Sequence, residues 1–160
     1  MPKVQLIPEL LSTYTSPMNK TTMSKLPLIL IAEDDEDDQM LMKSAFKDNQ
    51  IDCLLEFMAD GERLMEYLKA NDTRPSLILL DLNMPKVDGK TALKAIKNSA
   101  EYRHIPTMII STSSSEAEVR KVYDLGAAAY LVKPASYDDL IELVKHLTSF
   151  FFDTATLSKT

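Results

Sequence analysis

The stretch LILIAEDDEDD, residues 28–38, decides the fold. Five apolar residues, typical of a buried strand, run directly into six consecutive acids, and no basic residue lies within either run. Six like charges repel one another unless a cation, a basic side chain or solvent compensates them. The rest of the chain must therefore explain how this acidic run is accommodated.

Four further runs rich in apolar residues follow, and segments with helical spacing separate them. The runs are CLLEFM (53–58), SLILLDL (76–82), TMIIS (107–111) and AYLVK (129–133). Before residue 49 the helical spacing falls on Met40, Leu41 and Ala45; later segments repeat it at Leu64, Met65, Leu68; Ala92, Leu93, Ile96; Val119, Val122, Leu125; and Leu140, Leu143, Val144, Leu147. Near-continuous apolar strands predict burial on both faces. We therefore expect an α/β fold that is doubly wound: a flavodoxin-like (βα)5 three-layer sandwich with a parallel five-stranded sheet, order 2-1-3-4-5.

The three glycines fall at junctions between these elements. Gly61 and Gly89 open the helices after the second and third strands, and Gly126 ends a helix, where a left-handed C-cap needs no Cβ. Their placement agrees with the alternation of strands and helices.

Composition indicates one compact domain. The chain has 160 residues, of which 45% are apolar, and its net charge of −6 argues against nucleic-acid binding. We expect a loose N-terminal extension over residues 1–25, with Met23 as an alternative start, a domain over 26–152 and a polar tail over 153–160. The single cysteine, Cys53, excludes a disulfide framework and favours a buried thiol and a cytoplasmic location. No apolar run approaches the roughly 18 residues that cross a membrane.

Three acids mark the expected site. Glu33 and Asp34 lie at the carboxyl end of the first strand and Asp81 at that of the third, and these strands are neighbours in the order 2-1-3-4-5. A hard divalent cation such as Mg²⁺ would compensate the three carboxylates and bridge to phosphate oxygens. Glu36, Asp37 and Asp38 are interpreted only as negative charge at a helix N-terminus.

Two other classes of protein with an α/β architecture also bind or transfer phosphate groups. A flavodoxin-like cofactor binder would place Ser, Thr and Gly after the first strand to hold phosphate, whereas this chain places acids there. An aspartate-nucleophile phosphohydrolase would need a second Asp two residues after the nucleophile, where this chain has Asn83. Turnover of a phosphoester would favour the second class.

The motifs LILIAEDD, LILLDLNMPKVDG, IISTSS and YLVKP stand in the order and spacing of a known family. Over residues 28 to about 150 the chain resembles the receiver domain of two-component response regulators, the chemotaxis-regulator-like phosphoacceptor fold. The resemblance implies a stand-alone response regulator of a phosphorelay that is not an enzyme beyond self-catalysed phosphotransfer and autodephosphorylation. It assigns the phosphoacceptor to Asp81, the Mg²⁺ (or Mn²⁺) ligands to Glu33, Asp34, Asp81 and the backbone carbonyl of Asn83, and the family's hydroxyl and lysine to Ser111 and Lys133.

Further roles and partners follow from the same resemblance. A switch would couple Ser111 to Tyr130, while Asn83 and Ser113 would tune hydrolysis; the bond before Pro134 is cis in the family. The partners implied are a histidine kinase or phosphotransfer protein and a downstream protein target, with no nucleic acid and no membrane. A homodimer would use the face of the fourth helix, fifth strand and fifth helix, or the aromatic run Phe150–Phe152, of which at least one ring should be exposed. The two histidines, expected on the surface, are His104 and His146.

Overall fold

The computed structural model describes residues 26–157. The expected N-terminal extension, the alternative start at Met23 and residues 158–160 of the expected tail lie outside the described residues. Within residues 26–157, no helix combines the length and the apolar character needed to cross a bilayer.

A five-stranded parallel sheet forms the centre, in the order β2-β1-β3-β4-β5. Its strands are β1 (Leu28–Ala32), β2 (Leu54–Met58), β3 (Leu77–Asp81), β4 (Thr107–Ser111) and β5 (Ala129–Val132). The predicted fold class and strand order are confirmed. The prediction that all strands are fully buried holds for the three inner strands, whereas the edge strands β2 and β5 are only partly covered.

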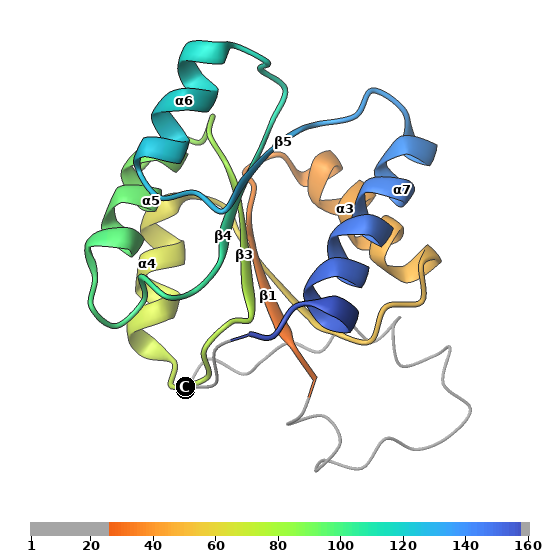
Figure 1. Cartoon of the computed structure of the whole chain (residues 1–160), viewed down its shortest axis with the longest axis horizontal. Helices are drawn as coiled ribbons and strands as arrows, with labels where there is room; N and C mark the ends of the chain where they lie inside the picture. Colours follow the sequence, from red (N-terminus) through yellow and green to blue (C-terminus); the bar gives the residue numbers. More distant parts are fainter. Residues whose placement is uncertain (1–25, 158–160) are drawn as a thin grey trace.

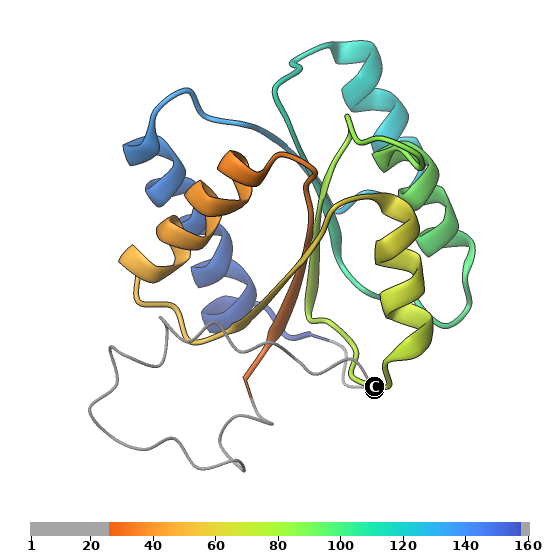
Figure 2. The same ribbon diagram turned by 180° about the vertical axis from the view of Figure 1, so that it is seen from behind.

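Helices cover both faces of the sheet (Figure 1). On one face lie α3 (Glu36–Asp48) and α7 (Tyr137–Thr148); on the other lie α4 (Gly61–Ala70), α5 (Gly89–Asn98) and α6 (Glu116–Asp124). Figure 2, from behind, shows the same three layers. Alternate residues of β1 enter the two apolar layers, Leu28 and Leu30 toward α4 to α6, and Ile29 and Ile31 toward α3 and α7.

Acidic N-caps fix where three of the helices begin. The side chain of Asp35 accepts backbone N–H groups at the start of α3, and Asp60 and Asp88 do the same for α4 and α5. Because Asp35 caps α3, Glu33 and Asp34 remain outside the helix at the end of β1. Gly126, after α6, has φ +98°, the left-handed conformation expected there.

The apolar face of α3 differs from the prediction. Met40 and Leu41 are exposed, by 64% and 45%, and the residues that face the core are Met42, Ala45 and Phe46. The cap at Asp35 sets the rotation of the helix, and the helical repeat from that point brings these three residues to the sheet.

The aromatic run continues α7 as a π-helical segment, η1 (Ser149–Thr154). Phe151 is buried and packs edge to face against Phe150, with ring centroids 5.3 Å apart, while Phe150 itself is 56% exposed. The expectation of one exposed ring in this run is confirmed. Cys53 is buried and both histidines are exposed, also as expected.

Candidate functional site

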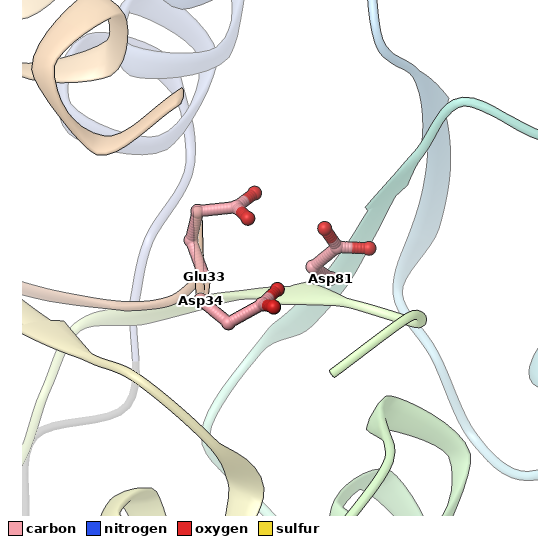
Figure 3. Close-up of side chains that lie close together, drawn as sticks. All are labelled: Glu33, Asp34 and Asp81. Carbon is pink, nitrogen blue, oxygen red and sulfur yellow. The ribbon is translucent and has the colours of Figure 1, made fainter. Parts of the chain in front are cut away.

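Three carboxylates from distant parts of the sequence meet at the carboxyl edge of the sheet. Glu33 and Asp34 follow β1, and Asp81 ends the adjacent β3. One carboxylate oxygen from each lies within 4.8 Å of the others, and Figure 3 shows the three groups around a common space. Glu33 and Asp81 are buried, whereas Asp34 is exposed. Solvent therefore reaches the cluster of three carboxylates from the side of Asp34.

Lys133 supplies the positive charge that the acidic run lacks. It follows β5, and its backbone N–H donates to the carbonyl of Ser111 at 2.7 Å. Its Nζ donates to Glu33 Oε2 at 2.6 Å, to Asp38 Oδ2 at 2.7 Å and to Asp81 Oδ2 at 2.8 Å. The peptide bond between Lys133 and Pro134 is trans in this structure, unlike the cis form that the family resemblance implied.

The position of Asp38 corrects one interpretation. Asp38 was assigned only to negative charge at the helix N-terminus, yet its carboxylate forms an ion pair with Lys133. The interpretation stands for Glu36 and Asp37, which are exposed in the first turn of α3. Asp38 is therefore a site residue that sequence reasoning missed.

Charge and burial act against each other in this cluster. Burial raises the pKa of Glu33 to about 7, and the neighbouring charge of Asp81 adds to the increase, while hydrogen bonds from Lys133 and the backbone of Asp35 oppose it. Burial disfavours the charged form of Lys133, but its hydrogen bonds to the three carboxylates outweigh this and raise its pKa. One ammonium cannot neutralise all the carboxylates around it, which leaves the site short of positive charge.

The oxygens of the site fit a hard divalent cation. Glu33 Oε1 accepts the N–H of Asp35 and Asp81 Oδ1 accepts the N–H of Asn83, each at 3.0 Å, while the other oxygens of these two groups contact Lys133. Asp34 adds a third, exposed carboxylate. Carboxylates, a backbone carbonyl and water are the ligands that Mg²⁺ and Mn²⁺ prefer. The donor set therefore fits either ion.

The expected switch residues lie around the loop after β4. Ser111 ends β4 and is fully buried, and its Oγ accepts the N–H of Ser113 at 3.2 Å. Tyr130, on β5, donates its hydroxyl to the carbonyl of Ser113 at 2.8 Å. Ser113 thus contacts both residues of the expected switch.

A protein-family model also matches most of the chain. The model described as the response regulator receiver domain matches residues 29–145. The chain belongs to this family. Membership favours the receiver interpretation over a flavodoxin-like cofactor binder and over an aspartate-nucleophile phosphohydrolase.

Several similar proteins are described as response regulators. Response regulator Rcp1 of Synechocystis is 37% identical over 135 residues, which cover 81% of this chain and 92% of Rcp1. The crystal structure of the phosphorylated cyanobacterial phytochrome response regulator RcpA is similar to the receiver domain described here, with a TM-score of 0.79, 35% identity and coverage of 84% of this chain and 99% of RcpA. The Mn²⁺-bound form of Rcp1 has a TM-score of 0.76 and 36% identity, covering 83% of this chain and 99% of that one.

Proposed function

We propose that Asp81 accepts a phosphoryl group from a histidine kinase or a phosphotransfer protein in the presence of Mg²⁺ or Mn²⁺. The phosphorylated chain then signals through noncovalent contacts with a downstream protein. The observation that carries this proposal is the Lys133 ammonium, paired with Glu33 and Asp81, whose carboxylates also lie close to the exposed carboxylate of Asp34. That arrangement joins a carboxylate nucleophile to a fixed positive charge and an open ligand position.

The chain's own groups have separate roles in the transfer. An Asp81 carboxylate oxygen forms a bond to phosphorus while the bond from phosphorus to the donor imidazole nitrogen breaks, and the imidazole keeps that electron pair. Lys133 neutralises one phosphoryl oxygen, and the Ser111 hydroxyl donates to another. The divalent ion, held by Glu33, Asp34, Asp81 and the carbonyl of Asn83, supplies further positive charge to the phosphoryl oxygens when bound.

Loss of the phosphoryl group is the second half of the proposed cycle. The amide of Asn83, which is exposed, orients the attacking water, and Ser113 is a short neutral neighbour that neither blocks nor charges the approach. An intermediate lifetime of the phosphorylated form follows. Ser111 and Tyr130 form the proposed switch that a downstream protein reads on the face of α6, β5 and α7.

Incubation with acetyl phosphate and Mg²⁺, followed by intact mass measurement, tests the assignment of Asp81. We expect the wild-type chain to gain one phosphoryl group that hydroxylamine removes, and Asp81→Asn to gain none. Asp37→Asn, which removes an exposed acid of the same charge, is the matched control and should react like wild type. Full, acid-stable labelling of Asp81→Asn would contradict the proposal.

The donor kinase is best sought among light-sensing histidine kinases first. This order rests on RcpA, described as a phytochrome response regulator, and on RPA3017, described as acting in red light signalling of R. palustris, which is 34% identical with a TM-score of 0.80. A phosphotransfer screen should show one kinase that phosphorylates the chain much faster than the others. The homodimer and the cytoplasmic location stay predictions. Sedimentation of wild type and Phe150→Ser tests the dimer.

A further inference from the structure

Lys90 and Glu118 form an ion pair between two helices that flank the site. Lys90 is the second residue of α5 and Glu118 the third of α6, and Nζ lies 2.8 Å from Oε1. The two side chains are 32% and 19% exposed, so solvent screens the pair only in part. A lysine in the first turn of a helix is opposed by the helix dipole. Glu118 compensates Lys90 at this otherwise unfavourable position.

The pair extends to the loop that follows Ser111. Hydrogen bonds from Lys90 and Ser113 lower the pKa of Glu118, which keeps its carboxylate charged and acting as an acceptor. Tyr130 Oη lies 3.4 Å from Glu118 Oε2 and 2.8 Å from the carbonyl oxygen of Ser113. Ser113 is therefore held through its carbonyl, which accepts from Tyr130, and the same Tyr130 hydroxyl lies next to the Glu118 carboxylate.

The orientation of Ser113 decides what the Ser111 hydroxyl can do. The N–H of Ser113 donates to Ser111 Oγ at 3.2 Å, so that oxygen already acts as an acceptor. A serine hydroxyl has one proton to donate. With its oxygen fixed by Ser113, the Ser111 proton is available for an oxygen arriving at the carboxyl edge of β3 and β4.

We propose that Lys90 and Glu118 are positioning residues for the phosphoryl group at Asp81, because through Tyr130 they hold Ser113, and through Ser113 the Ser111 hydroxyl, in the donating orientation. This inference rests on the proposed function. Neither residue touches the phosphoryl group. Their effect is to order the β4–α6 loop before the group arrives, which lowers the cost of binding it.

This role can be tested without a kinase. The affinity for beryllofluoride in the presence of Mg²⁺ is measured from the amide chemical shifts of the loop after β4. Lys90→Met and Glu118→Gln should each raise the apparent dissociation constant for beryllofluoride about three- to tenfold, at the lower end of the couplings found between residues in contact. The double variant should bind beryllofluoride with about the affinity of the single variant that binds less tightly, because either change already breaks the same ion pair. Lys90→Arg keeps the charge and should bind as wild type does.

Matched controls lie on the same two helices. Lys94→Met removes a positive charge from α5, and Glu116→Gln removes a negative charge from the first turn of α6; both residues are exposed. Neither control should change beryllofluoride affinity. Melting midpoints measured in parallel identify variants that only lose stability. If Lys90→Met and Glu118→Gln bind beryllofluoride with wild-type affinity, the role of the ion pair is wrong but the proposed function is unaffected. If the wild-type chain binds no beryllofluoride, the proposed function is wrong as well.

Discussion

Gly89 leaves no room for a side chain beside Asp81. A Cβ atom at position 89 would lie 2.7 Å from Leu82 Cα and closer still to the carbonyl oxygen of Asp81. The N–H of Gly89 donates to the carbonyl of Leu82 at 3.1 Å, which closes the loop between β3 and α5. The first turn of α5 therefore packs directly against the backbone of the proposed phosphoacceptor.

Gly89→Ala should disturb both stability and chemistry. The added methyl group must move either α5 or the end of β3, and overpacking of this kind costs about 1–3 kcal/mol of unfolding free energy. The displaced Asp81 should also react more slowly with acetyl phosphate. Gly126→Ala is the control. Its positive φ makes alanine costly there as well, but position 126 lies next to Lys97 and not next to Asp81. Urea unfolding and phosphorylation rates should show both variants destabilised and only Gly89→Ala slowed.

Lys133→Met should make folding depend on divalent cations. Its side chain is 16% exposed and those of Glu33 and Asp81 are 7% exposed, so removing the ammonium leaves two buried carboxylates uncompensated, at a cost of about 2 kcal/mol or more. Millimolar Mg²⁺ should recover part of that loss and raise the melting midpoint of Lys133→Met more than that of wild type. Lys145→Met removes an exposed lysine and should change little. An equal response to Mg²⁺ in all three proteins would contradict this.

Asp38→Asn should affect reactivity more than stability. The Asp38 side chain is 42% exposed, so its ion pair with Lys133 contributes less than about 1 kcal/mol to the unfolding free energy. Because the substitution weakens the ion pair between Asp38 and Lys133, the Lys133 ammonium is held less firmly next to Asp81. We expect a severalfold change in the phosphorylation rate with acetyl phosphate, and none in Asp37→Asn. Identical rates in the two variants would leave Asp38 without a role in the reaction.

The Cys53 thiol should be inert in the folded protein. It is 5% exposed, and burial, with the nearby charge of Asp52, raises its pKa from 9.0 to about 12. At pH 8 its reaction with a disulfide reagent should be slow and should become complete in denaturant. Because the folded state disfavours the thiolate, the unfolding free energy should decrease as the pH rises above about 9, and Cys53→Ala should remove this contribution. Rapid labelling without denaturant would show the thiol to be accessible.

Several features of this chain could be predicted because they depend on local pattern. Apolar runs such as residues 28–32 identify strands, and an acid directly after a run marks the carboxyl edge of a parallel sheet. That reasoning identified Glu33, Asp34 and Asp81 as neighbours, and the structure brings their carboxylates together. Strand order followed from the fold class rather than from any single residue.

Other features depend on contacts that a local pattern does not contain. Six consecutive acids do not reveal which one faces a lysine 95 residues away, and so Asp38 was missed. The inward face of α3 depends on where its cap lies, and so Met40 and Leu41 were expected in the core. Apolar runs look alike in central and edge strands, and so Val132, which is 49% exposed, was expected to be buried.

The Lys133 cluster has a consequence for the order of events during protein synthesis. Lys133 joins Glu33 across 100 residues and Asp81 across 52. A ribosome must therefore complete all five strands before the ammonium can reach the carboxylates. A nascent chain that already contains Asp81 still lacks this cation, so the proposed reaction with a phosphoryl donor has to wait until β5 joins the sheet.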